Sequence, residues 1–164
     1  MKKKLLQIIA IAAIGACAYP CKTPTVIDNT YSMTSFPVEC MGTDLDGSET
    51  LRAFGTGKNK AQAMETAKKN AVKAVLFDGI RNGAQGCNVR PVIGGANPME
   101  KNEAYFNRFF ADGGAYKEYT SMVDEKRTSR LKSSDKSIEN WGVVVRVNRS
   151  ALKERMIADG IIEP

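Results

Sequence analysis

Alternating apolar and polar positions in the first regular part of the chain predict a pair of strands. Residues 36–43 and 50–56 show this period of two, which is the spacing of side chains on one face of a strand. Asp46 and Gly47 lie between them and favour the positive φ angles of a hairpin turn. We therefore expect the two strands to pair antiparallel.

Alanines at spacings of three and four residues predict a long helix over residues 59–80. Lysines occupy the remaining face of this helix, and the small alanine side chains allow it to lie close to a sheet. Residues 82–97 are rich in Gly and Asn, which indicates a loop with one short apolar piece. A second, shorter helix is expected over residues 99–110, because a proline precedes it and two glycines follow it.

The last part of the chain predicts two long strands and a final helix. The strands are expected over residues 116–131 and 137–148, and the second one alternates in the manner of a half-buried strand. Ser150 is expected to cap a helix over residues 151–159, which Gly160 ends. The order β-β-α-α-β-β-α indicates the α+β fold class, with a small antiparallel sheet and a long helix packed on one face.

The first sixteen residues follow the pattern of an export signal. Lysines at positions 2, 3 and 4 precede an apolar run at residues 5–14, and the small residues Gly15 and Ala16 follow it. A transmembrane helix needs about twenty apolar residues, so a run of about ten predicts a signal peptide and not a membrane-spanning anchor. We expect residues 1–16 to be removed.

The residues around position 17 decide what cleavage leaves behind. Residues 14–17, Ile-Gly-Ala-Cys, resemble a bacterial lipobox, in which the cysteine thiol is acylated and cleavage makes the cysteine the first residue. On this hypothesis Cys17 is the lipidation site, residues 17–35 are a flexible tether and residues 36–164 form a single domain. The Ala-Cys-Ala triplet also fits ordinary signal peptidase, which would cut after Ala18 and release a soluble protein.

Glycines followed by an alanine-rich helix carry a resemblance to a known family. Residues 53–57, Ala-Phe-Gly-Thr-Gly, and the alanines after them resemble small LPP-type outer-membrane lipoproteins, whose domain is shared with the N-terminal part of flagellar assembly protein T. The closing strand from Trp141 and the final Gly-Ile-Ile at 160–162 are similar as well. The resemblance covers residues 36–162 and implies a small antiparallel sheet crossed by a long helix, on an envelope lipoprotein with no known catalytic role. Residues 82–114 depart from the family as a longer Gly-rich and aromatic segment.

Charge and cysteine usage add to this interpretation. Losing residues 1–16 lowers the formal net charge from +6 to +3, too mild a balance to predict a nucleic-acid partner. In an exported chain, Cys40 and Cys87 are the pair we favour for a disulfide, which leaves Cys21 in the tether free or intermolecular. Reduced and buried cysteines are the alternative. The chain has no histidine, and we expect neither a cofactor nor a metal site.

Motifs for enzyme chemistry are incomplete. The absence of histidine excludes Ser-His-Asp triads and the usual zinc sites. Ser133 and Ser150 each begin a Ser-x-x-Lys match, but the partner motifs of penicillin-recognising enzymes are missing, so a turn and a helix cap are favoured over a Ser-Lys hydrolase. The glycines of residues 55–58 lack the spacing of a phosphate loop, and the acidic residues 44–49 lack that of a calcium loop. We expect the protein not to be an enzyme.

A group of aromatic side chains is the candidate interaction surface, because aromatic residues dominate binding hot spots, although at helical spacing they more often form core. Our hypothesis is a non-enzymatic envelope lipoprotein, held by its lipid at the outer membrane on the periplasmic side, that binds or scaffolds another envelope protein. The alternative is a soluble exported protein that captures a ligand in residues 82–114. The candidate aromatic residues are Tyr105, Phe106, Phe109 and Phe110, with Tyr116 and Tyr119 nearby.

Overall fold

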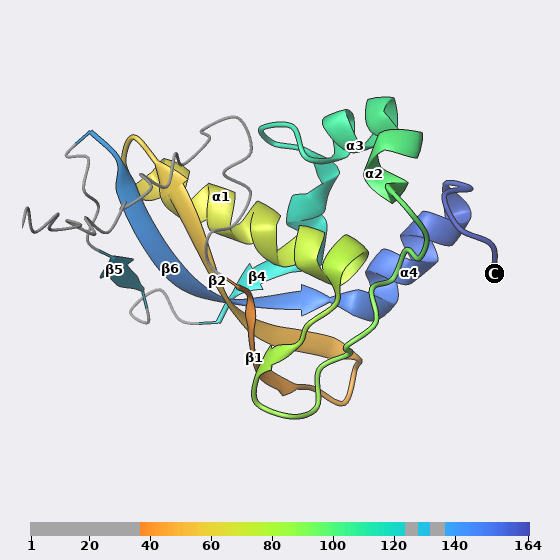
Figure 1. Ribbon diagram of the computed structural model, residues 1–164, viewed down its shortest axis with the longest axis horizontal. Helices are drawn as coiled ribbons and strands as arrows, with labels where there is room; N and C mark the ends of the chain where they lie inside the picture. Colours follow the sequence, from red (N-terminus) through yellow and green to blue (C-terminus); the bar gives the residue numbers. More distant parts are fainter. Residues whose placement is uncertain (1–36, 124–127, 132–136) are drawn as a thin grey trace, which may run out of the picture. The chain divides into compact units, whose positions relative to one another are not determined.

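A mixed sheet with helices packed on one side forms the domain (Figure 1). The computed structural model describes residues 37–123, 128–131 and 137–164. The expected signal peptide and tether, with Cys17 and Cys21, lie outside the described residues, as does Ser133. Within the described part, six strands and four α-helices are present: β1 (Glu39–Thr43), β2 (Ser48–Gly57), α1 (Lys60–Lys73), β3 (Asn82–Gly83), α2 (Pro98–Lys101), α3 (Glu103–Phe109), β4 (Thr120–Met122), β5 (Ser129–Leu131), β6 (Glu139–Asn148) and α4 (Arg149–Ala158).

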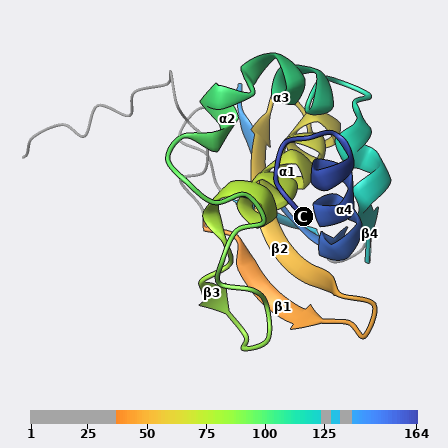
Figure 2. The ribbon, with the colours of Figure 1, turned by 90° about the vertical axis from the view of Figure 1, so that its right-hand side faces the viewer.

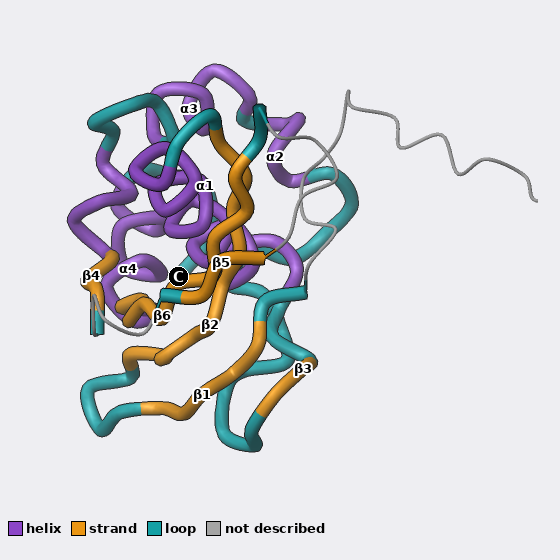
Figure 3. Tube along the Cα trace, turned by 90° about the vertical axis from the view of Figure 1, so that its left-hand side faces the viewer, coloured by secondary structure: helices purple, strands orange, loops and turns teal. Residues whose placement is uncertain are grey.

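The central strands β2 and β6 pair antiparallel over their full lengths, from Ser48 opposite Asn148 to Gly57 opposite Glu139. The strand order is β3-β1-β2-β6-β4, and β5 also pairs with β6. β1 pairs antiparallel with β2, as the hairpin pattern predicts, but parallel with the two residues of β3. The sheet is therefore mixed, and the expectation of a purely antiparallel sheet was wrong. Figures 2 and 3 show β1 and β3 extending away from the helices.

The single strand expected over residues 116–131 is three shorter elements. Residues Ala115–Tyr119 form a 3₁₀-helix (η3), because the Tyr116 side chain is fully buried and its hydroxyl donates a hydrogen bond to Glu65 on α1. The chain then pairs with β6 twice, as β4 and as β5. The alternation of apolar and polar residues along this segment does not show that Tyr116 is held by a residue of α1.

Close contact between backbones holds α1 on the sheet. Ala63 and Ala67 are fully buried and face Gly55 of β2. A Cβ atom at Gly55 would lie 2.2 Å from the Ala63 carbonyl oxygen and 2.3 Å from the Ala67 nitrogen, so only glycine fits there. Asn70 adds a hydrogen bond from Nδ2 to the Phe54 carbonyl oxygen at 2.8 Å. The spacing of alanines thus positions the helix as the sequence predicts.

The long helix begins and ends close to the expected residues, whereas the other two helices differ from the expected ones for local reasons. α1 begins after Asn59, whose side chain accepts a hydrogen bond from Gln62 N, and it continues as a π-helix (η2, Ala74–Asp78) that ends at Gly79. The helix expected over residues 99–110 is divided into α2 and α3, because Asn102 leaves the helical region with φ −125°. α4 is capped by Asn148 and not by Ser150, since Asn148 Oδ1 accepts from Ala151 N at 2.9 Å.

Candidate functional site

The predicted aromatic residues divide into core and surface. Phe106 is fully buried, while Phe109 and Phe110 expose 4% and 7% of their area. Phe106 packs edge-on against Phe77 of η2, with ring centroids 4.9 Å apart. These three rings therefore belong to the core and are not a broad interaction surface. Tyr105 is only half-buried and remains at the surface.

Tyr105 lies at an open cleft between α3, η3 and α4, which we call the aromatic cleft. Its volume is about 410 Å³. The lining residues come from α3, from the first residue of η3, and from α4 together with the residue that follows it. Six residues line it: Tyr105, Arg108, Phe109, Ala115, Arg155 and Asp159.

A hydrogen-bond network joins α3 to the end of α4 across the aromatic cleft. The Tyr105 hydroxyl and Arg155 Nε both donate to Asp159 Oδ2, each at 2.6 Å. Burial and the hydrogen bond to Asp159 raise the pKa of Tyr105 to about 12. The same hydrogen bond, together with that from Arg155, lowers the pKa of Asp159. Asp159 is therefore a charged carboxylate whose charge is matched by Arg155.

Arg108 is the second guanidinium of the aromatic cleft. It is exposed and lies in the last turn of α3, where the helix dipole favours a positive charge. Among the described residues, no hydrogen bond or ion pair to its side chain is present. Because Arg155 and Asp159 compensate each other, the aromatic cleft keeps one positive charge without a counter-charge.

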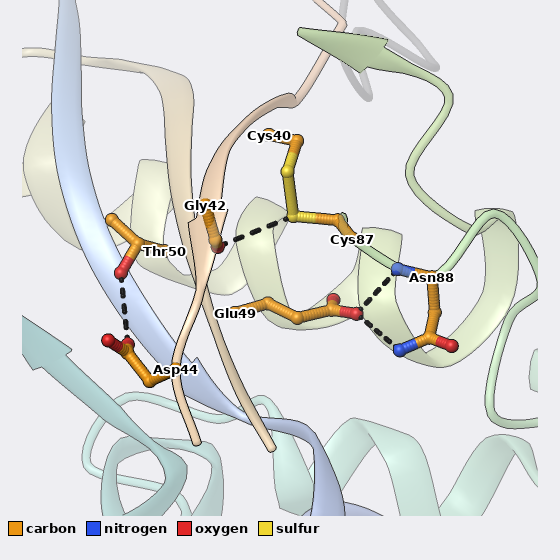
Figure 4. Close-up of a disulfide and its surroundings, with 7 residues drawn as sticks. All are labelled: Cys40, Gly42, Asp44, Glu49, Thr50, Cys87 and Asn88. Atoms are coloured by element: carbon orange, nitrogen blue, oxygen red, sulfur yellow. Dashed lines mark hydrogen bonds between the residues drawn. A yellow bond between two sulfur atoms is a disulfide. The ribbon is translucent and has the colours of Figure 1, made fainter. Parts of the chain in front are cut away.

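A disulfide joins Cys40 of β1 to Cys87 of the loop after β3, the pair that the sequence favours (Figure 4). Beside it lies Glu49, whose side chain is fully buried. Glu49 Oε1 accepts hydrogen bonds from the backbone N and side-chain Nδ2 of Asn88, at 2.8 and 2.9 Å. Glu49 Oε2 and Arg149 Nη1 are buried without a hydrogen-bond partner in the described structure. This cluster fastens the loop to the sheet.

The weaker motifs do not assemble into sites within the described residues. Ser150 and Lys153 are both exposed, whereas a Ser-Lys nucleophile needs a sheltered helix start. Asp44 is engaged by Arg146 through Nε and Nη2, at 2.8 and 2.7 Å, while Glu49 turns toward Asn88, so the hairpin carboxylates do not converge on a cation. Residues 37–123, 128–131 and 137–164 contain no group of three or more potential metal ligands.

Comparison with protein families, curated proteins and solved structures finds no match for this chain. None of the helices in the described part of the chain combines the length and apolar character that crossing a membrane requires. Four lining residues were not identified from the sequence: Ala115 and the charged residues Arg108, Arg155 and Asp159. Arg155 and Asp159 are four apart on one helix, which is a spacing that can indicate an ion pair, but nothing local connects either of them to Arg108.

Proposed function

We propose that this protein is an exported bacterial envelope lipoprotein, anchored by fatty chains on Cys17, whose domain is a binding module and not an enzyme. The observation that carries the proposal is the cysteine placed directly after a short apolar run and the residues Ile-Gly-Ala. Two fatty chains on one residue hold a protein stably at a bilayer, whereas one chain gives only marginal binding.

The Cys40–Cys87 disulfide supports export. Disulfides persist in oxidising compartments such as the bacterial periplasm and are rare in the cytosol. The pair joins elements that are 47 residues apart, so it also closes a long loop in the domain. A structural disulfide of this kind agrees with the signal peptide that residues 1–16 predict.

We further propose kinship with the LPP-type outer-membrane lipoproteins, with the anchor in the outer membrane and the domain on the periplasmic side. What supports the kinship is the role of the residues that carry the resemblance. Gly55 and the alanines that follow it bring α1 into contact with β2, so the motif serves the packing of a helix on a sheet. Another envelope protein is the proposed partner.

A fatty-acid labelling experiment with two cysteine variants tests the anchor. The full chain is expressed in a bacterium fed an alkyne-tagged palmitate, and label is measured on the purified protein. We expect wild type and Cys21→Ser to carry label and Cys17→Ser to lose it, because only the thiol after the lipobox is acylated. Cys21→Ser is the matched control, since it removes a thiol four positions away. Equal labelling of Cys17→Ser, or an unlabelled wild type, would contradict the proposal.

The alternative function is a soluble exported binding protein. The Ala-Cys-Ala triplet supports it, because small residues at these positions fit cleavage after Ala18 by ordinary signal peptidase. A mature protein that begins at Tyr19 and stays in the aqueous fraction would favour this alternative over the lipoprotein.

A further inference from the structure

We propose that the aromatic cleft is a binding site for a carboxylate group carried on an apolar or aromatic body of side-chain size, with Arg108 as the residue that binds the anion. The inference rests on the proposed binding function and names its ligand class. It does not depend on the lipid anchor, because every residue that carries it lies in the folded domain.

The size and walls of the aromatic cleft suit a small apolar body. Its volume of about 410 Å³ lies within the range of about 300 to 1,000 Å³ that is typical of ligand sites. The Tyr105 and Phe109 rings are stacked 5.9 Å apart, and Phe109 stacks in turn on Tyr119 at 6.1 Å. Ala115 adds a small apolar side chain to the lining. Because Phe109 exposes only 4% of its area, the apolar area open to an aromatic or aliphatic group comes from the half-buried Tyr105 ring and from Ala115.

The charged residues that line the aromatic cleft favour an anionic ligand. Asp159 is already paired with Arg155 and hydrogen-bonded by Tyr105, so the only uncompensated charge among the lining residues is that of Arg108. A guanidinium presents a planar fork that binds a carboxylate through two parallel hydrogen bonds. One unmatched positive charge fits a monoanion, which favours a carboxylate over a phosphate dianion.

The walls are held in place before a ligand arrives. The hydrogen bond from Tyr105 to Asp159 joins α3 to α4, and Phe109 is anchored in the core with 4% of its area exposed. The turn between α3 and η3 is closed by a hydrogen bond from Gly114 N to the Ala111 carbonyl oxygen at 2.8 Å. A site whose walls are already ordered loses less entropy on binding, which raises affinity.

Two sources can supply this chemistry, namely a free aromatic acid and the C-terminal carboxylate of a peptide. The probes are therefore 3-phenylpropanoate for the free acid and N-acetyl-glycyl-phenylalanine for the peptide terminus. Each is paired with its neutral amide, which has the same apolar body without the charge. Binding to the full mature protein is measured by saturation-transfer NMR and titration. Tighter binding of the peptide probe indicates a protein partner, and tighter binding of the free acid indicates a small-molecule ligand.

The deciding variants are Arg108→Gln and Arg130→Gln. Both remove an exposed arginine and the same charge, but Arg130 lies on β5, far from α3 in Figure 1. We expect Arg108→Gln to weaken binding of the carboxylate probes by about tenfold or more, a free-energy loss of about 1.4 kcal/mol per factor of ten. Arg130→Gln should bind as wild type does, and the amides should bind weakly throughout.

Three results would overturn the assignment: equal binding by Arg108→Gln and wild type, equal binding of acids and amides, or no binding of either acid. Each of these leaves the labelling of Cys17 untouched. Conversely, a protein that carries no fatty-acid label but binds the acids through Arg108 would contradict the lipid anchor and support the binding site.

Discussion

Replacing Glu49 by alanine is expected to destabilise the domain more than any exposed carboxylate does. Glu49 is fully buried, and its Oε1 atom is the acceptor for both the backbone N and the Nδ2 of Asn88. The substitution removes this acceptor and also a carboxylate whose charge favours the partly buried Arg149 guanidinium, the pKa of which is lowered by burial. The loop that carries Cys87 would then lose its main polar attachment to β2.

The magnitude follows from the groups left without a partner. An unsatisfied buried donor costs about 1 to 3 kcal/mol, so the loss of the acceptor shared by two donors would cost about 2 to 6 kcal/mol if both were buried. Because Asn88 is largely exposed and water can reach its side chain, we expect a total near the lower end, about 2 to 4 kcal/mol. Glu49→Gln keeps one oxygen acceptor and should lose about half as much.

Urea unfolding at neutral pH, with the disulfide intact, measures this difference. Glu39→Ala is the matched control, because Glu39 lies on the neighbouring strand in an exposed pair with Arg52 at 3.3 Å, and such pairs contribute about 0 to 1 kcal/mol. With a urea slope of about 2 kcal/mol per molar, Glu49→Ala should lower the midpoint by roughly 1 to 2 M. A midpoint shift for Glu49→Ala no larger than that for Glu39→Ala would refute the buried-anchor argument.

Three further predictions concern stability. Gly55→Ala should lower the free energy of unfolding, measured by thermal unfolding, by about 1 to 3 kcal/mol, because its Cβ would lie 2.2 Å from a backbone carbonyl oxygen of α1. Gly94→Ala, which has open space around it, is the control and should be nearly neutral. Equal effects of the two substitutions would contradict the close packing of α1 on β2. Replacing Cys40 and Cys87 by alanine should lower the unfolding free energy by about 4 kcal/mol in urea, and an unchanged midpoint would argue against a stabilising bridge. Burial raises the pKa of Glu65, but hydrogen bonds from Tyr116 and Lys117 outweigh it and bring the pKa from 4.5 to about 2. Its stabilisation is therefore complete above about pH 4.5 and lost toward pH 2, and Glu65→Gln should flatten the urea-midpoint profile in that window.

The sequence predicts those elements whose packing is periodic. The alternation through Val143, Val145 and Val147 predicts β6, and each of these side chains is fully buried. The observed helix boundaries differ from the predicted ones where a single polar side chain sets the end of the helix, as Asn148 does when it caps α4. β3 pairs only two residues, next to the disulfide loop, and it has no local pattern that could reveal it.

The aromatic cleft could be predicted only in part, because helical spacing does not say which side of a helix faces water. Tyr105 and Phe109 were identified as candidates, yet Phe106 between them is core. The charged half of the aromatic cleft brings together Arg108 on α3 and Arg155 on α4, and only the tertiary fold sets that distance. A sequence pattern could suggest the aromatic residues of the cleft, but it could not show that Arg108 lies near Arg155 and Asp159, which are paired with each other.

The mass of the mature N-terminal peptide is the most direct test of the lipid anchor. The protein is purified from envelopes without exposure to base, which would hydrolyse esters, and is then digested and analysed by mass spectrometry. The proposal predicts a peptide that begins at Cys17 and carries the added mass of fatty chains. A peptide that begins at Tyr19, or an unmodified Cys17 thiol, would contradict it.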